Sequence, residues 1–256
     1  MLNAIAQQQL STAGEIQQCF LGKRLATTNY PDISLLMRPA YNAGGDWYDT
    51  FDLNNKTFLV VADVCDKGVG AALFMSVFRS LIHYSAHSFC NDNTSETEPL
   101  DKVITSVNDY MSTEHGDTSM FATVFLACIN KNTKRIDYVL AGHEEPILIQ
   151  KDGTSYSFEI SGPAIGLFPC ATYSVNSTCF EAGAILLAYS DGVVDARNES
   201  DQSFGHNRLN QLIKNLKQNT SDLTAQVIVN ALISELDIHM GSQEQFDDIT
   251  IAAAIL

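Results

Sequence analysis

Four short acidic motifs contain the residues of this chain that could do chemistry. They are Gly44-Gly45-Asp46-Trp47-Tyr48-Asp49, Asp63-Val64-Cys65-Asp66-Lys67-Gly68, Ser190-Asp191-Gly192 and Asp247-Asp248-Ile249-Thr250. Each motif lies at the edge of a short apolar run of the kind that forms a buried strand. Carboxylates at such strand ends can converge on one rim of a sheet, where several oxygens suit hard divalent cations such as magnesium and manganese. The motifs therefore indicate a divalent metal site.

Each motif taken alone also has an ordinary explanation as a turn. Asp accepts local backbone hydrogen bonds and Gly tolerates a positive φ, so an Asp-Gly pair often follows a strand. The set is harder to explain in this way, because every motif has a second acid close to the first. These second acids are Asp49, Asp66, Asp195 and Asp248. Like charges so close together repel each other, and bound cations would remove that cost.

The elements that position these motifs follow from hydrophobic periodicity and turn signals. Strands are predicted at about residues 34–41, 47–53, 57–64, 120–130, 135–141, 147–150, 156–159, 173–180, 184–189 and 249–256. Helices are predicted at 3–21, 69–89, 100–114, 205–217 and 223–239, with a polar loop at 91–99. Hairpin-spaced strands interrupted by paired helices favour an antiparallel α+β layer fold over alternating βαβ units.

Composition limits the classes of function. The 256 residues are 45% hydrophobic and 18% charged, as in a globular protein, and the six cysteines have no zinc-type spacing. A net charge of −15 argues against nucleic-acid and anionic-membrane surfaces. The first ten residues do not resemble a signal peptide, and no apolar run approaches the ~20 residues of a membrane span. We therefore expect a soluble, cytoplasmic protein without a nucleic-acid or membrane partner.

Taken in order, the motifs resemble the SpoIIE/RsbU-type branch of the metal-dependent (type 2C) protein serine/threonine phosphatases. The resemblance covers residues 30–256 and includes further matching stretches at 120–123, 141–143, 162–167 and 204–205. It implies a four-layer α-β-β-α sandwich, in which two packed antiparallel sheets are flanked by helices. It divides the chain into a phosphatase domain at 26–256 and an N-terminal linker or dimerisation-type helix at 1–25. The alternative for that helix is a terminal element packed on its own domain.

The resemblance also implies a site with two divalent metal ions, manganese or magnesium. Its metal ligands would be the side chains of Asp46, Asp63, Asp191 and Asp247 and the carbonyl of Val64. The same four aspartates are expected to act in catalysis through metal-bound water, because paired metals activate water and neutralise charge on phosphoryl oxygens.

Four further residues are expected to assist this site. Asp49 and Asp248 would orient the ligands, whereas Asp195 and His143 correspond to an auxiliary third metal. His143 is more simply interpreted as a structural turn histidine. Asp66 is expected to form a turn, and the single tryptophan, Trp47, to pack in the core.

The function implied is a metal-dependent serine/threonine phosphatase that acts on a bacterial signalling protein, such as an anti-sigma-factor antagonist of the STAS type. Such an enzyme would serve a partner-switching or two-component pathway, with an upstream sensor or receiver domain and a homodimer as further partners. A non-catalytic partner-binding module with the same fold is the alternative, disfavoured because every expected ligand is present. Another two-metal enzyme, such as a nucleotidyl cyclase or phosphodiesterase, is disfavoured because no basic cluster is present to bind its phosphates.

Overall fold

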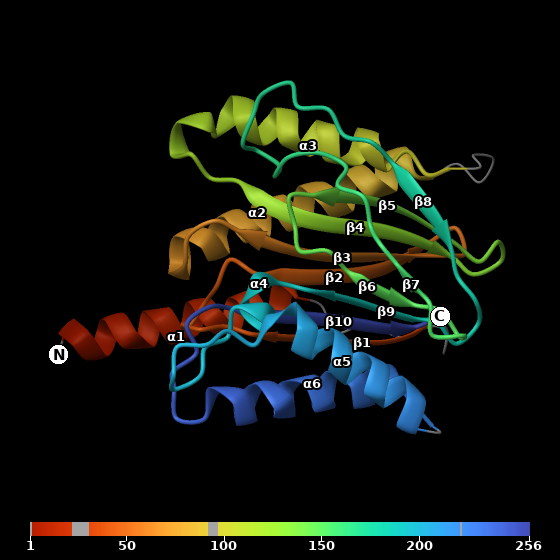
Figure 1. Ribbon diagram of the computed structural model, residues 1–256. Coiled ribbons are helices and arrows are strands. Elements are labelled where there is room, and N and C mark those ends of the chain that lie inside the picture. The colour runs from red at the N-terminus through yellow and green to blue at the C-terminus, as the bar shows by residue number, and fades with distance from the viewer. Residues whose placement is uncertain (1, 22–30, 92–96, 221) are drawn as a thin grey trace.

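Two five-stranded antiparallel sheets pack face to face, and helices cover both outer faces (Figure 1). The computed structural model describes residues 2–21, 31–91, 97–220 and 222–256. The predicted domain boundary at 25/26 and most of the predicted loop at 91–99 lie outside the described residues. The α+β fold with two packed antiparallel sheets and flanking helices is confirmed.

The first sheet has the strand order β2-β3-β4-β5-β8. Its strands are β2 (Trp47–Leu53), β3 (Lys56–Val64), β4 (Ala122–Asn130), β5 (Arg135–Ala141) and β8 (Asn176–Cys179). Helices α2 (Gly68–Phe89) and α3 (Leu100–Glu114) cover its outer face, where Trp47, Met75 and Phe78 are fully buried. Almost every residue of β3 is buried because one face meets these helices and the other meets the second sheet.

The second sheet has the strand order β1-β10-β9-β6-β7. Its strands are β1 (Asp32–Arg38), β10 (Ile249–Ile255), β9 (Ile185–Tyr189), β6 (Ile147–Ile149) and β7 (Ser155–Tyr156). Helices α5 (Gly205–Asn219) and α6 (Ala225–Met240) cover its outer face. Between the sheets, large side chains such as Leu59 and Phe125 pack against the small residues Ala188, Ala252 and Ala254.

Helix α1 (Leu2–Phe20) packs beside α2 and against the loop that precedes β2. The Gln17 side chain makes two hydrogen bonds with the backbone of Gly44, Nε2 to O at 2.6 Å and N to Oε1 at 3.0 Å. A Cβ atom at Gly14 would lie 2.0 Å from the carbonyl oxygen of Asn42. The helix therefore contacts the segment that leads into Asp46.

Most predicted elements are present with shifts of one or two residues at their ends, and the predicted strand at 156–159 is the clearest error. The structure has only β7 (Ser155–Tyr156) there. Phe158 N donates to Glu145 Oε1 and Glu159 N donates to Tyr138 Oη, so side chains take the hydrogen bonds that a strand ladder would provide. The four-residue helix α4 (Asp191–Val194) and the 3-10 turn Gly116–Thr118 were not predicted, because they are too short to give a periodic signal.

Helix α2 contradicts the expectation that no apolar segment approaches the length of a membrane span. By length and composition its 22 residues would be sufficient. Its buried residues, among them Ala71, Met75 and Phe78, instead pack against the first sheet and α3. A central helix between a sheet and a second helix is apolar for that reason.

Candidate metal centre

The four aspartates predicted as ligands come from both sheets and meet at one end of the sandwich. Asp46 precedes β2 and Asp63 is the penultimate residue of β3, whereas Asp191 follows β9 and Asp247 precedes β10. Ser190 N donates to Thr250 O at 3.0 Å, which joins the ends of β9 and β10. The charges of Asp191 and Asp247 both act on Asp63, and the charge of Asp63 acts on Asp46. The structure thus brings the four side chains together.

Burial and mutual repulsion raise the pKa values of three of these aspartates, Asp46, Asp63 and Asp191. Burial, followed by the charges of Asp63 and Asp248, raises the pKa of Asp46 well above its usual value. Burial and then the charges of Asp191 and Asp247 raise the pKa of Asp63 to about 7. Burial and then Asp247 raise the pKa of Asp191 to about 6. Three carboxylates are therefore held where their ionised forms are unfavourable.

Among the described residues, a basic side chain pairs with one member of the group, Asp247. Lys67 Nζ lies 2.9 Å from Asp247 Oδ2, donates to Phe246 O at 2.8 Å and lies 3.9 Å above the Phe246 ring. Within the described residues, no other base forms an ion pair with any of the four aspartates. In the same part of the chain, no three His, Cys, Asp or Glu side chains converge tightly enough to hold a metal as they stand.

The donor set nevertheless fits a hard divalent cation. The Val64 carbonyl lies beside Gly45, where a Cβ atom would be 2.5 Å from Val64 O and 3.3 Å from Asp63 Oδ1. A carbonyl and several carboxylates supply the oxygens that magnesium and manganese prefer. A bound cation would also relieve the repulsion that raises the pKa values of Asp46, Asp63 and Asp191.

Asp248 fastens the loop that carries Asp46. Its Oδ1 accepts from Ala40 N at 2.7 Å and its Oδ2 accepts from Gly45 N at 2.9 Å. The approach is so close that a Cβ atom at Gly44 would lie 1.9 Å from Asp248 Oδ2. In addition, Asp248 N donates to Asp247 Oδ1 at 2.9 Å. Asp248 therefore orients two of the four aspartates, Asp46 through the loop and Asp247 through its own backbone.

Ser190 is a site residue to which the sequence analysis gave no role. Its Oγ donates to Asp46 Oδ2 at 2.6 Å and accepts from Thr250 N at 2.9 Å. The side chain is completely buried. A polar residue at the end of the apolar run at 184–189, directly before a candidate ligand, was the signal that could have identified it.

The SpoIIE family, described as stage II sporulation protein E, matches residues 54–255. The chain belongs to this family. The match covers most of the phosphatase domain that the motifs predicted and includes three of the four aspartates, Asp63, Asp191 and Asp247.

Two named proteins are related to this SpoIIE-family chain along much of its length. It is 34% identical over 265 residues to Protein IcfG of Synechocystis sp., a match that covers 96% of this chain and 41% of that protein. It is 30% identical to the phosphoserine phosphatase RsbU of Bacillus subtilis, a match that covers 75% of this chain and 55% of RsbU. The chain thus spans about half the length, or less, of the curated relatives it matches.

Solved structures show the same fold. The SiaA-PP2C domain of Pseudomonas aeruginosa superposes with a TM-score of 0.85 at 18% identity and covers 100% of this chain and 99% of that one. RsbX in complex with magnesium superposes with a TM-score of 0.61 at 17% identity and covers 88% of this chain and 94% of that one. The SpoIIE-family domain therefore has the PP2C fold.

The structure gives Asp49 a different place from the one predicted for this SpoIIE-family site. Its Oδ1 accepts from Arg79 Nη2 at 3.0 Å and its Oδ2 lies 2.9 Å from His83 Nδ1. Because β2 alternates its faces, Asp49 points to α2 on the same side as Trp47. The expectation that Asp49 orients Asp46 is therefore wrong, and Asp49 instead fastens β2 to α2.

Asp195 and His143 differ in their relation to the aspartates. Asp195 is exposed, and its charge contributes to the raised pKa of Asp191. His143 Nδ1 lies 2.8 Å from Thr123 Oγ1, and burial lowers the pKa of His143 to about 3, so its ring is neutral. These contacts agree with a structural turn histidine, and a role for Asp195 at a third metal stays a prediction.

Two further charged residues near these motifs, Asp66 and Arg38, have structural roles. Asp66 adopts a φ of 74°, and its Oδ1 accepts from Lys67 N at 2.8 Å, so the predicted turn is confirmed. Arg38 binds Asp237 Oδ1 at 2.7 Å and Gln245 Oε1 at 2.7 Å. These bonds hold β1 to α6 and to the segment before Asp247.

Proposed function

We propose that this SpoIIE-family domain is a metal-dependent phosphatase that hydrolyses phosphoserine or phosphothreonine on a bacterial signalling protein. The observation that carries the proposal is a group of three aspartates, the buried Asp46 and the partly buried Asp63 and Asp191, that form no ion pair with a base among the described residues. Buried carboxylates in such a group are costly unless cations neutralise them. A purely structural role would not require a group of carboxylates at this position.

Two ions, manganese or magnesium, would be held by Asp46, Asp63, Asp191, Asp247 and the Val64 carbonyl. When bound, such ions supply Lewis acidity that activates water and neutralises charge on a phosphoryl group.

Neighbouring residues of the protein orient the carboxylate oxygens that would bind the ions. Ser190 donates to Asp46 and fixes the direction of its remaining lone pairs. Asp248 holds the loop at 40–45 in place, so Asp46 is positioned by backbone that is itself hydrogen-bonded. Lys67 keeps Asp247 paired at the edge of the group.

The proposed substrate class rests on what the related proteins are named. RsbU is named a phosphoserine phosphatase, which supports a phosphorylated protein, and we propose an anti-sigma-factor antagonist of the STAS type. Because the chain spans only 41% of IcfG and 55% of RsbU, we also propose that it works with an upstream sensor or receiver domain. We place this activity in the cytoplasm, where such partners occur.

Phosphate release from paired peptides tests the proposal. The chain is incubated with manganese and either a phosphoserine peptide, its phosphotyrosine equivalent or a phosphorylated STAS-type protein. We expect release from phosphoserine and from the protein, little from phosphotyrosine, and none after chelation of the metal. If calorimetry shows that metal binds but no phosphoester is cleaved, the domain is a partner-binding module and the proposal is wrong.

A further inference from the structure

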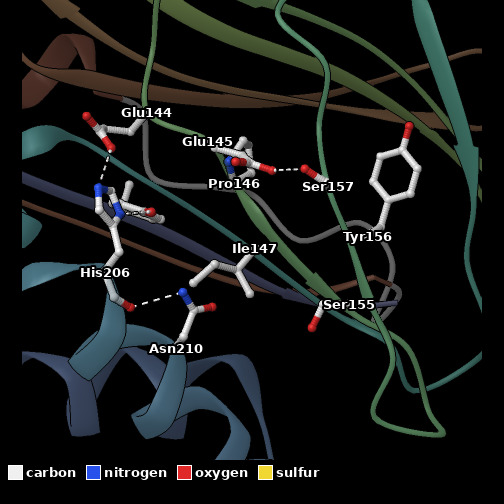
Figure 2. Close-up of a pocket in the computed structure, with 10 residues that line it drawn as sticks. Glu144, Glu145, Pro146, Ile147, Ser155, Tyr156, Ser157, His206 and Asn210 are labelled. Carbon is white, nitrogen blue, oxygen red and sulfur yellow. Dashed lines mark hydrogen bonds and ion pairs between the residues drawn. The ribbon is translucent and has the colours of Figure 1, made fainter.

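A cavity of about 450 Å³ lies between the second sheet and α5. Glu144 and Glu145, from the segment between β5 and β6, form one edge, and His206 and Asn210 of α5 form another (Figure 2). Tyr156 of β7 lies on the opposite side. The volume of the cavity is within the range of pockets that enclose small molecules or single side chains.

The described residues that line this cavity include two glutamates, and His206 is the single base among them. No Lys or Arg is among the ten residues that line it. Glu144 Oε2 lies 3.7 Å from His206 Nε2, beyond hydrogen-bond distance, so that pairing leaves the carboxylate able to bind another donor. Glu145 Oε1 accepts from Ser157 Oγ at 2.8 Å and Phe158 N at 2.9 Å, which fixes the second carboxylate at the rim.

The remaining walls suit a long side chain with a charged end. Pro146 and Ile147 offer apolar surface, and Tyr156 and Tyr189 offer aromatic rings. Lys and Arg bury their methylene stems on apolar surface and place their cationic ends near carboxylates or ring faces. An anionic ligand would meet two carboxylates and no permanent cation, so the charge of the cavity excludes it.

The cavity is joined to the candidate metal centre through β9. Tyr189, only 2% exposed, lines the cavity, and the next residue, Ser190, donates to Asp46. The charge of Glu144 acts on both Tyr189 and Asp191. If a substrate polypeptide places its phosphorylated residue at the aspartates, the residues that flank the phosphorylated residue therefore pass close to the cavity.

We propose that this cavity is a specificity subsite for a basic side chain, Lys or Arg, that flanks the phosphorylated residue of the substrate. The inference rests on the proposed phosphatase function and names a property of its substrate. The net charge of −15 favours the approach of a basic segment in general, and the two glutamates select the position of its charge.

Binding of labelled peptides tests the subsite without requiring turnover. Short phosphoserine peptides carry one arginine in turn on either side of the phosphoserine, and each has a partner with citrulline, which keeps the shape and lacks the charge. We expect the best arginine peptide to bind about five- to tenfold more tightly than its citrulline partner, as for a partly buried ion pair. This ratio should shrink with added salt.

The double variant Glu144→Gln/Glu145→Gln should bring the ratio close to one. The matched control Glu114→Gln/Glu235→Gln removes two exposed acids on α3 and α6 and should leave the ratio at its wild-type value. Because each variant is compared on paired peptides, a general change in binding cancels. A wild-type ratio of one, or a ratio that the Glu144/Glu145 variant leaves intact, would overturn the subsite.

Turnover of the same peptides separates this inference from the proposed function. If no peptide is hydrolysed in the presence of manganese, the phosphatase proposal fails, while the binding ratio still decides on the subsite. If all peptides are hydrolysed with equal kcat/KM and equal affinity, the phosphatase stands and the subsite is wrong. A charge-dependent kcat/KM that Glu144→Gln/Glu145→Gln abolishes supports both.

Discussion

At the scale of single residues, Gly192 is a position where close backbone packing constrains the candidate metal centre. A Cβ atom there would lie 1.9 Å from the backbone oxygen of Asp248. Gly192→Ala must therefore push α4 away from the segment before β10, and the aspartates on either side, Asp191 and Asp247, would move with it. We expect the free energy of unfolding to fall by about 1–3 kcal/mol, as in other overpacked sites.

Urea unfolding of Gly192→Ala and of Gly70→Ala measures this effect against a matched control. Gly70 lies in the first turn of α2, and a Cβ atom there would meet nothing within 4 Å, so Gly70→Ala should stay within about 1 kcal/mol of the wild type. Equal stability of the two variants would show that the contact between Gly192 and Asp248 is easily relaxed.

The raised pKa of Asp63 gives the metal-free protein a defined pH dependence. Burial and the neighbouring carboxylates raise this pKa from 3.8 to about 7 in the folded chain. The folded state therefore binds the proton more tightly than the unfolded state, and the contribution of Asp63 is most favourable below pH 3.8. Stability should decline as the pH rises through this window, and bound metal should remove the decline.

Melting temperatures in chelator at about pH 5 and about pH 8 test this sign. We expect the wild type to melt higher at the lower pH, relative to Asp63→Asn, which cannot ionise at this position. Manganese should raise the wild-type value mainly at the higher pH. An identical pH response in Asp63→Asn would assign the effect to other groups.

Strand ends with acidic turns are local features, so the residues alone predicted that carboxylates would converge, and the resemblance to the phosphatase family implied which four aspartates would meet. Asp46, Asp63, Asp191 and Asp247 come together, while their role as ligands stays a prediction. The contact of Lys67 with Asp247 could not be predicted, because it joins residues from different sheets. Asp49 was misjudged because its partners lie on the next helix, a full loop and strand away.

At the scale of elements, α1 is the piece placed to influence the loop that carries Asp46. Gln17 makes two hydrogen bonds with Gly44, and Gly44 contacts the carboxylate of Asp248. Gln17→Ala removes both bonds and leaves buried backbone groups without partners, which should cost about 1–3 kcal/mol. We also expect weaker manganese binding, because the loop is less well held.

Manganese calorimetry and urea unfolding of Gln17→Ala, with the exposed Gln9→Ala as control, test the coupling. Deletion of residues 1–22 extends the test to the whole helix, with metal-dependent turnover and oligomeric mass measured together. If neither variant changes metal affinity, turnover or mass, α1 is a passive tail that does not influence the loop that carries Asp46.

Periodicity predicted the long elements well and the short ones badly. Helix α3 and strands β2 and β5 have the predicted limits, since each has a complete apolar face and clear turn signals. β7 is shorter because Glu145 and Tyr138 take hydrogen bonds from the following backbone. Such substitution of side chains for a strand partner depends on residues distant in sequence and leaves no local pattern.

At the scale of the whole molecule, the candidate metal centre forms where one end of the first sheet lies beside one end of the second sheet. Asp46 and Asp63 belong to the first sheet, whereas Asp191 and Asp247 belong to the second. The apolar layer that fixes the sheets against each other contains Leu59 and Phe125 opposite the small side chains of Ala252 and Ala254. The core thus sets the distance between the two halves of the site.

The most direct test of metal-dependent catalysis at this centre is manganese-dependent phosphate release from a phosphoserine peptide by the wild type and by Asp63→Asn. The substitution keeps the side-chain volume and removes one of the central charges, so the metal-free variant should remain folded by circular dichroism. We predict turnover that requires metal in the wild type and falls by about 100-fold or more in the variant. Near-normal turnover in folded Asp63→Asn, or wild-type turnover that persists in chelator, would contradict this mechanism.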